Sequence, residues 1–269
     1  METIELAIAG ATGWTGTAIA EGALAAPDIS LKSAIARRSA GQDLGAALGR
    51  EPLGVPVHAS VEEALEGVDV LVEFTSHTHA KGIALAAIER GVAVVIGSSG
   101  LTADDFREVD DAARAAGVGA VAAGNFSLTA AMMLAGAELA ARHLAHREII
   151  DYAKAGKPDA PSGTARELAE RLAEVRAPQV DLPVDQVAGR PDARGANVAG
   201  TQVHSVRVPS FVVSTEVLFA GDDERLSIRH DAGSSAAPYV NGVLLAVRRA
   251  RGHTGLVRGL DRILLQTEG

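Results

Sequence analysis

The stretch Ile4-Glu5-Leu6-Ala7-Ile8-Ala9-Gly10-Ala11-Thr12-Gly13-Trp14-Thr15-Gly16 decides the predicted fold of the first half of the chain. A β pattern runs directly into glycines at positions 10, 13 and 16, and a helical pattern follows to about Ala26. Such a turn lets backbone amides approach a pyrophosphate at a helix N-terminus. The glycine spacing differs from the usual dinucleotide fingerprint, and tight packing alone is the alternative explanation. The residues expected to contact a dinucleotide here are Gly10, Thr12, Gly13, Trp14 and Thr15.

The second β pattern, from Leu31 to Ala36, ends in Arg37 and Arg38. In NAD-binding proteins this strand commonly ends in a carboxylate that holds the ribose 2′-hydroxyl. Two guanidinium groups stand here instead, and guanidinium groups bind phosphate well. Two solvated arginines are the alternative interpretation. Together with the glycine turn, this strand end favours NADP(H) over NAD(H).

The alternation of strand and helix continues along the chain. Strand patterns at 68–74, 92–96 and 118–123 are separated by helical patterns, one of which begins at a capping pair of Thr102 and Asp105. Repeated βα units predict a mainly parallel sheet with its ligand site at the carboxyl ends of the strands. Small polar or glycine residues follow these strands, in Glu73-Phe74-Thr75, Gly97-Ser98-Ser99-Gly100 and Gly124-Asn125-Phe126-Ser127. For the two phenylalanines taken singly, core packing is the better explanation.

The second half of the chain contains the run Lys157-Pro158-Asp159-Ala160-Pro161-Ser162-Gly163-Thr164-Ala165. The run is predicted to be a loop that ends at a helix N-terminus, because Ser162 and Thr164 offer hydroxyls to unpaired amides and a helical pattern continues to Pro178. A helix N-terminus attracts anions, and Lys157 adds a mobile cation and a proton donor. A capped loop with a solvated lysine is the alternative.

A long apolar helix from about Ser127 to His143 and β patterns at 201–208, 212–220 and 224–230 complete the second half, with an exposed loop predicted at 178–197. We therefore expect an α/β fold with a Rossmann-type parallel sheet, followed by an α+β domain with an open mixed or antiparallel sheet. The expected boundaries are residues 1–126 plus 238–269 for the dinucleotide-binding domain and 127–237 for the substrate-binding and oligomerisation domain. Open sheets tend to associate, so a homo-oligomer is expected.

Composition excludes several classes of function. The formal net charge of −9 argues against binding to nucleic acid or to an anionic membrane. The chain has no cysteine, so it has no disulfide and no thiol nucleophile, and its eight histidines lack metal-ligand spacing, so no metal site is expected. It shows neither a basic N-terminal signal region nor an apolar run of membrane-spanning length. A cytoplasmic location is the expectation.

The run Lys157–Ala165 resembles the signature of the dihydrodipicolinate reductases, nicotinamide-dependent enzymes of the diaminopimelate route to lysine. The strand ends quoted above are also similar to family elements, and the resemblance covers nearly the whole chain. It implies reduction of 4-hydroxy-tetrahydrodipicolinate or a related cyclic imine with NADPH, a small carboxylate substrate and a homotetramer. It implies Lys157 as the catalytic residue and Ser99, Lys154, Ser162, Gly163 and Thr164 as substrate-binding residues. The further cofactor contacts that it implies are Phe74, Thr75, Gly97, Ser99, Gly124, Asn125 and Phe126.

The sequence departs from this family in the substrate pocket. The family's histidine pair, whose first member serves as a general acid/base, falls on Ala153 and Lys154. Its basic carboxylate-binding residue falls in Ser234-Ser235-Ala236, and a further glycine and histidine are Ser210 and Ser214. Loss of a general acid/base typically costs about 10²–10⁴ in rate. Three hypotheses follow: a reductase for the family substrate, a reductase for a substrate with a single carboxylate, and an inactive NADP(H)-binding paralogue.

Overall fold

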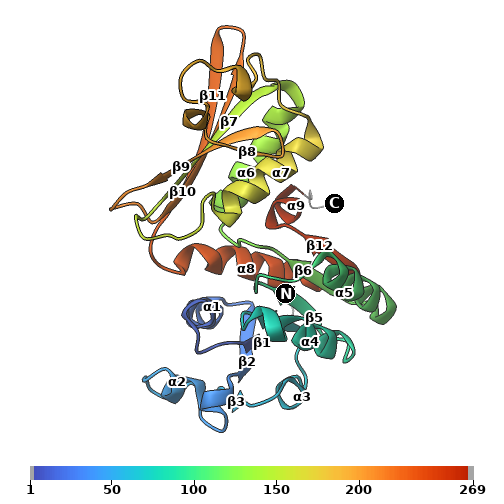
Figure 1. Cartoon of the computed structure of the whole chain (residues 1–269). Coiled ribbons are helices and arrows are strands. Elements are labelled where there is room, and N and C mark those ends of the chain that lie inside the picture. The colour runs from blue at the N-terminus through green and yellow to red at the C-terminus, as the bar shows by residue number, and fades with distance from the viewer. Residues whose placement is uncertain (1–2, 266–269) are drawn as a thin grey trace. The chain divides into compact units, whose positions relative to one another are not determined.

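The computed structural model describes residues 3–265, which form two compact units (Figure 1). The first unit comprises Met1–Ala131 and Ser235–Gly269, and the second comprises Met132–Ser234. Residues 1–2 and 266–269, which the sequence assigns to the first domain, lie outside the described residues. Each unit has its own sheet and its own apolar core.

The first unit is built on a seven-stranded sheet with the order β12-β6-β5-β4-β1-β2-β3, in which every pairing is parallel. Its strands are β1 (Ile4–Ala9), β2 (Ile29–Ile35), β3 (Val57–His58), β4 (Val70–Glu73), β5 (Ala93–Ile96), β6 (Gly119–Ala122) and β12 (Gly255–Arg258). The predicted Rossmann-type sheet is therefore confirmed. The two edge strands, β3 and β12, were not predicted. Strand β3 has only two residues, and β12, with the sequence Gly-Leu-Val-Arg, lacks the continuous apolar run of the other four-residue strands.

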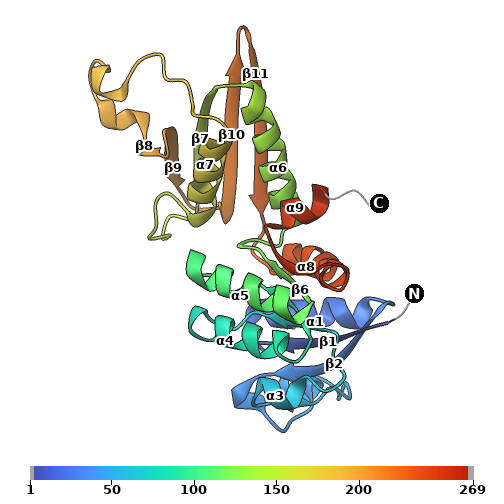
Figure 2. The ribbon, with the colours of Figure 1, turned by 90° about the vertical axis from the view of Figure 1, so that its right-hand side faces the viewer.

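Helices cover both faces of this sheet (Figure 2). Its helices are α1 (Trp14–Ala25), α2 (Leu44–Ala47), α3 (Val61–Ala64), α4 (His77–Ile88), α5 (Ala103–Ala116), α8 (Ala237–Ala250) and α9 (Leu260–Leu265). Side chains of α1 and α8 join one core cluster, and those of α3, α4 and α5 join another on the opposite face. Burial of the strands on both faces explains their continuous apolar runs. The predicted capping pair is present, since Thr102 and Asp105 cap each other's backbone amides at the start of α5.

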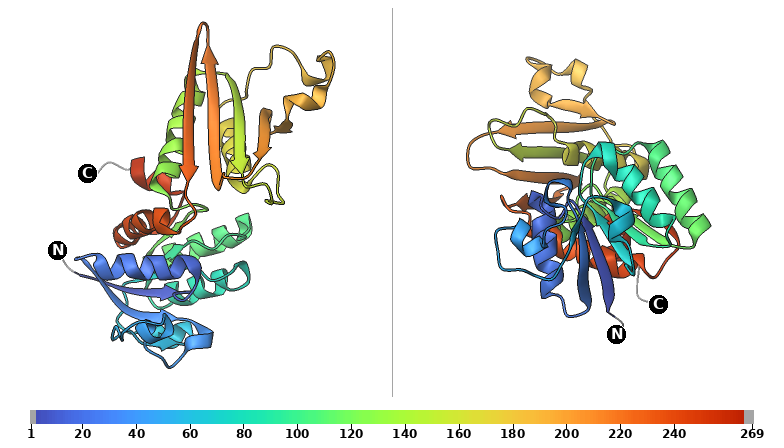
Figure 3. Two further views of the ribbon diagram at one scale, coloured as in Figure 1. Left: turned by 90° about the vertical axis from the view of Figure 1, so that its left-hand side faces the viewer. Right: turned by 90° about the horizontal axis from the view of Figure 1, so that it is seen from below.

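The second unit is built on a five-stranded mixed sheet with the order β11-β10-β7-β9-β8 (Figure 3, left). Its strands are β7 (His146–Ala153), β8 (Ala196–Val198), β9 (Thr201–Arg207), β10 (Val213–Gly221) and β11 (Glu224–Ala232). The β7–β9 pairing is parallel and the other three are antiparallel. The parallel pair follows from the connection through helix α7 (Gly163–Val175), because a crossover helix returns the chain in the same direction. This sheet confirms the predicted second, mixed sheet.

Helices α6 (Leu128–His143) and α7 cover one face of the second sheet with an apolar core that includes Ile149, Leu168 and Phe219. The other face carries a polar and aromatic cluster. There the ring of Tyr152 stacks on Phe211 at 5.0 Å between ring centroids and lies 4.8 Å from the Arg229 guanidinium carbon. A homo-oligomer that uses this face remains a prediction.

The stretch 178–197, predicted to be an exposed loop, contains two short 3₁₀ turns and the start of β8. The turns are Val184–Gln186 and Pro191–Arg194, and Arg194 forms an ion pair with Glu148 of β7. Most of the stretch is exposed, as expected. The pairing of β8 with β9 was not predicted, because three residues between Gly195 and Ala199 give no periodic signal.

A substitution at Gly242 of α8 tests how closely the first unit is packed. A Cβ atom at Gly242 would lie 1.9 Å from the Phe126 carbonyl oxygen, so we expect Gly242→Ala to lower the free energy of unfolding by at least about 1–3 kcal/mol. The matched control is Gly82→Ala in α4, where nothing lies within 4 Å of the added atom. This control is expected to stabilise the protein by about 0.5–1 kcal/mol through helix propensity. Urea unfolding measures both changes, and equal effects would contradict the packing described here.

Candidate functional site

Parallel pairing brings four strand ends of the first unit to the same edge of its sheet, namely the carboxyl ends of β1, β4, β5 and β6. Strand order reverses between β1 and β4, the position at which ligands bind in open α/β sheets. The predicted cofactor-binding residues that follow these four strands are Gly10, Thr12, Gly13, Trp14, Thr15, Phe74, Thr75, Gly97, Ser99, Gly124, Asn125 and Phe126. The structure therefore collects at one edge residues that lie more than a hundred positions apart in the sequence.

The glycine turn after β1 is closely packed backbone against backbone. Gly10 has φ +85°, and a Cβ atom there would lie 2.2 Å from the Phe74 carbonyl oxygen. A Cβ atom at Gly16 would lie 2.1 Å from the Gly10 carbonyl oxygen. No side chain caps the start of α1, and its first turn has no acidic residue. Packing explains the first and third glycines, and the uncapped helix N-terminus next to Gly13 suits an anion.

The Phe74 ring lies against the turn after β5. A Cβ atom at Gly97 would lie 2.0 Å from the ring's Cζ, so only glycine leaves the ring this space. The Phe74 and Phe126 centroids are 5.8 Å apart with an interplanar angle of 59°. Phe126 is buried, as its core-packing interpretation predicts, whereas Phe74 is half-buried.

Glu73 is a buried carboxylate at this edge to which the sequence reasoning gave no role of its own. Its Oε1 accepts hydrogen bonds from the Thr75 amide at 2.7 Å, the Thr75 hydroxyl at 2.5 Å and the Ser98 hydroxyl at 3.0 Å. Its Oε2 is buried and has no hydrogen-bond partner among the described residues. The side chain thus ties the turn after β4 to the turn after β5. An acidic residue closing a strand of valines and leucine is the signal that could have identified it.

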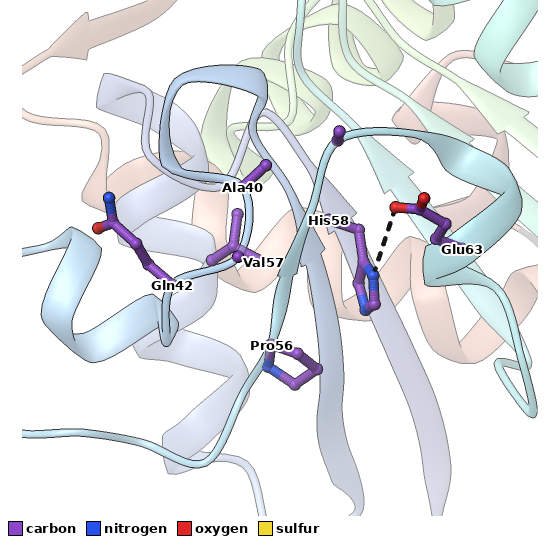
Figure 4. A pocket seen from close by; sticks show the side chains of 8 residues that line it. Ala40, Gln42, Pro56, Val57, His58 and Glu63 are labelled. Carbon is purple, nitrogen blue, oxygen red and sulfur yellow. Dashed lines mark ion pairs between the residues drawn. The ribbon is translucent and has the colours of Figure 1, made fainter.

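Arg37 and Arg38 lie just beyond β2, in the 3₁₀ turn η1 (Arg37–Ser39). Both side chains are exposed, and neither has an ion-pair partner within residues 3–265. A pocket lies beside this turn, lined by residues of 40–42 and 56–63, with the His58 ring 3.8 Å from the Glu63 carboxylate (Figure 4). No predicted site residue lines this pocket. The two arginines are free to meet an anionic group.

In the second unit, residues 154–162 connect β7 to α7, and we call this segment the lysine loop after Lys157. It is a loop that ends at a helix N-terminus, as predicted. The helix α7 begins at Gly163, and the Ser162 hydroxyl caps it by accepting a hydrogen bond from the Ala165 amide at 3.3 Å. Ser162 is buried, and its hydroxyl is used to cap the helix. Gly163 is exposed and Thr164 is half-buried. Nothing lies within 4 Å of a Cβ atom added to Gly163, and packing therefore gives no reason for glycine at this position.

Asp151 fixes the end of this loop. It is fully buried on β7, and its Oδ2 accepts hydrogen bonds from the Ser162 amide at 2.8 Å and from the Arg207 Nη2 at 2.7 Å. Burial raises the pKa of Asp151, but the hydrogen bonds from Arg207 and Ser162 outweigh it and hold the pKa below its ordinary value. The sequence reasoning assigned no role to either charged residue, because they lie 56 positions apart on strands whose pairing it did not derive.

The remaining predicted residues of this loop differ in their surroundings. The Lys157 Nζ forms an ion pair with the Asp159 Oδ1 at 2.6 Å, and this contact lowers the pKa of the Asp159 carboxyl. Lys154 is exposed and has no ion-pair partner in the described part of the chain. Ala153 is fully buried. Of the predicted substrate-binding residues, Ser99 belongs to the first unit and the others belong to the second.

Within residues 3–265, no cluster of three or more histidine, aspartate or glutamate side chains is placed to hold a metal ion. In the same range no helix combines the length and the apolar character needed to cross a membrane.

The fold and this edge define an α/β protein of the dinucleotide-binding type with a separate second domain. Comparison with protein families is more specific. The family description "Dihydrodipicolinate reductase, N-terminus" matches residues 4–126, and "Dihydrodipicolinate reductase, C-terminus" matches residues 128–264. The chain belongs to the dihydrodipicolinate reductase family of oxidoreductases.

Individual relatives agree with this assignment. The chain is 40% identical to the 4-hydroxy-tetrahydrodipicolinate reductase of Moorella thermoacetica, over 97% of this chain and 98% of that protein. It is 36% identical to the reductase of the same name from Desulfitobacterium hafniense, over 98% of this chain and 100% of the other. A solved structure of dipicolinate-bound dihydrodipicolinate reductase from Paenisporosarcina sp. TG-14 matches with a TM-score of 0.87 and 28% identity, over 97% and 99% of the two chains. The amine dehydrogenase of Mycobacterium smegmatis, at 19% identity and a TM-score of 0.67, shares the fold.

The lowered pKa of Asp151 predicts how stability depends on pH. A carboxyl group whose pKa is lower in the folded state stabilises the protein above its unfolded pKa of about 3.9, and this contribution is lost as the pH falls through the folded value. We expect the free energy of unfolding of Asp151→Asn to fall less steeply between about pH 5 and pH 3 than that of the wild type. Urea unfolding at a series of pH values measures both slopes. Identical slopes would contradict this account of Asp151.

Proposed function

We propose that the protein is an NADP(H)-dependent reductase of the 4-hydroxy-tetrahydrodipicolinate type, acting on a small cyclic imine that carries carboxylate. The observation that carries the proposal is the anchored lysine loop, in which buried Asp151 holds Ser162 at the N-terminus of α7 and the Asp159 carboxylate pairs with Lys157. The family's signature run is retained within this anchored loop. Relatives that carry the reductase name match along nearly their full length.

The first unit fits a dinucleotide. The turn after Gly10 leaves backbone amides uncapped at the start of α1, where a pyrophosphate would sit. Arg37 and Arg38 are free to hold a 2′-phosphate, which favours NADPH over NADH. The rest of the dinucleotide would lie along Phe74, Thr75 and the turns at Gly97 and Gly124. We assign residues 1–126 plus 238–269 to cofactor binding and 127–237 to substrate binding and oligomerisation.

The lysine loop supplies the chemistry of the protein's own side chains. When bound, reduced nicotinamide supplies the hydride. Lys157 donates a proton to the substrate nitrogen. Its positive charge also compensates the negative charge that hydride addition to the imine carbon leaves on that nitrogen. The free amides of Gly163 and Thr164 hold a substrate carboxylate at the helix N-terminus. The missing side chain of Gly163 leaves room for that group to approach the backbone.

One observation favours the alternative of an inactive NADP(H)-binding paralogue. Ala153 occupies the place of the family histidine, is fully buried, and can neither move a proton nor donate a hydrogen bond from its side chain. Lys154 is exposed next to it and is the nearest replacement for a donor. The loss of basic residues near Ser235 also favours a substrate with a single carboxylate. These alternatives share the cofactor site and differ in turnover.

The proposal extends to the protein's surroundings. The polar and aromatic face of the second sheet, around Tyr152, suits association into a homo-oligomer, and the family resemblance favours a tetramer. The net charge of −9 favours a small-molecule partner over nucleic acid or an anionic membrane, and a cytoplasmic location fits a biosynthetic reductase.

Lys157→Ala tests the catalytic assignment. We expect kcat to fall about 10²–10⁴-fold because the proton donor is removed, while the Kd for NADPH is unchanged. NADPH oxidation in the presence of freshly generated 4-hydroxy-tetrahydrodipicolinate gives kcat, and NADPH fluorescence gives Kd. The matched control is Lys32→Ala, a lysine of the first unit bonded to the Gly67 carbonyl, which should keep full activity. A wild-type protein that binds NADPH without oxidising it would favour the paralogue instead.

The double variant Arg37→Ala/Arg38→Ala tests the choice of cofactor. Removing a charge-assisted contact to a 2′-phosphate costs about 1.5–3 kcal/mol, so the Kd for NADPH should rise roughly 10–150-fold. NADH has no such phosphate, and its Kd should stay within about twofold of the wild-type value. Fluorescence titration with both nucleotides measures the change. An equal loss for NADPH and NADH would refute a 2′-phosphate contact.

A further inference from the structure

Four charged side chains of the second unit alternate in sign from its core to the lysine loop. Asp151 is fully buried, the Arg207 side chain is 15% exposed, and Asp159 and Lys157 lie in the loop at 42% and 23%. Asp151 contacts Arg207, Arg207 contacts the Asp159 backbone, and the Asp159 carboxylate contacts Lys157. The side chain of Lys157 is thus joined to the core through three successive contacts.

Arg207 is the member of this series that connects strand and loop. Its Nη2 donates to the Asp151 Oδ2 at 2.7 Å and to the Asp159 carbonyl oxygen at 2.9 Å. Its Nη1 donates to the carbonyl oxygens of Asp151 at 2.9 Å and Val206 at 3.0 Å. A planar guanidinium with fixed donor directions holds such a set of acceptors in one geometry. The middle of the loop is therefore fixed at Asp159, and its end is fixed where the Ser162 amide donates to Asp151.

We propose that Arg207 is a positioning residue for Lys157, acting through Asp159 and relying on buried Asp151. This inference rests on the proposed reductase function, because it concerns the ammonium group assigned there to proton donation. Both terminal nitrogens of Arg207 donate to backbone and carboxylate oxygens of the protein, and its buried Nε has no hydrogen-bond partner among the described residues. Its effect on turnover passes through the loop.

The chemistry of lysine makes such a device necessary. Lysine is a point charge on a flexible four-carbon stem and does not hold one position by itself. The Asp159 carboxylate holds the Lys157 Nζ at 2.6 Å, but Asp159 is part of the same loop and can orient an ammonium group only when its own backbone is fixed. Arg207 provides that fixed point. With alanine at position 153, no histidine shares the proton-transfer task, and the placement of Lys157 has correspondingly more effect.

Arg207→Lys is the informative variant. It keeps a positive charge beside Asp151, but one ammonium group cannot reproduce the fork that reaches both Asp151 and Asp159. We expect kcat/KM to fall roughly 10–10²-fold, as displacement of a reacting group by about 1 Å does, with the Kd for NADPH unchanged. In a Lys157→Ala background the same substitution should change kcat/KM by less than about threefold, because the group that it misplaces is already absent.

Arg147→Lys is the matched control. Arg147 is likewise buried in the second unit, and it bridges the Thr201 hydroxyl at 3.2 Å and the Arg176 carbonyl oxygen at 2.7 Å. None of these partners belongs to the lysine loop. This control should lower the melting temperature and leave kcat/KM unchanged.

The same variants can also be compared by ligand binding, which gives a result even if their turnover is too slow to measure. The Kd for pyridine-2,6-dicarboxylate, measured by calorimetry in the presence of NADP, should rise in Arg207→Lys and in Lys157→Ala, with no further rise in the double variant. Equal losses from Arg207→Lys in both backgrounds, or none in either, would overturn the positioning role and leave the reductase proposal standing. A wild-type protein with neither turnover nor dicarboxylate binding would overturn the proposed function, and this inference with it.

Discussion

The buried carboxylate of Asp151 is the constraint on which the functional part of the second unit depends. A carboxylate without exposure to solvent is tolerated only when hydrogen bonds and an opposite charge replace the lost water. The Ser162 amide, the Ser205 hydroxyl and Arg207 supply these contacts to the Oδ2 atom, whereas Oδ1 has no hydrogen-bond partner among the described residues. Through Ser162 and through the Asp159 carbonyl oxygen that Arg207 also contacts, they fix the end and the middle of the loop between β7 and α7.

The first unit uses a related device at the edge of its parallel sheet. Glu73 is also fully buried, and it collects the donors of Thr75 and Ser98 from the turns after β4 and β5. Glycine contributes in a different way, because Gly10, Gly16 and Gly97 let backbone and ring atoms approach where any side chain would collide. In both units the strand ends are ordered by a few contacts that tolerate little change, while the helices behind them are held by ordinary aliphatic packing.

Membership in the dihydrodipicolinate reductase family is established over residues 4–126 and 128–264, which is nearly the whole chain. Ala153 lies on the same face of β7 as Asp151, two residues further along the strand. The position to which we assign the family histidine therefore lies on the face of β7 that also carries Asp151. Under the function we propose, proton donation therefore depends on Lys157 alone.

The amino-acid sequence alone determined the local features: the glycine turn after the first strand, the capping pair at Thr102, the parallel α/β first half and the helix start at Ser162. These features depend on periodicity, backbone conformation and hydrogen bonds between near neighbours, all of which can be recognised from a few consecutive residues. It also supplied the family resemblance, through the uninterrupted run from Lys157 to Ala165.

Tertiary structure alone decided the partners of the buried charges. Asp151 and Arg207 lie 56 positions apart, and the parallel pairing of β7 with β9 places them together. The edge strand β12 and the tie from Glu73 to Ser98 depend in the same way on which strands become neighbours. Strand order and register are set by the packing of whole faces, and no single segment contains that information. For this reason the sequence identified the lysine, and the fold identified what holds it in place.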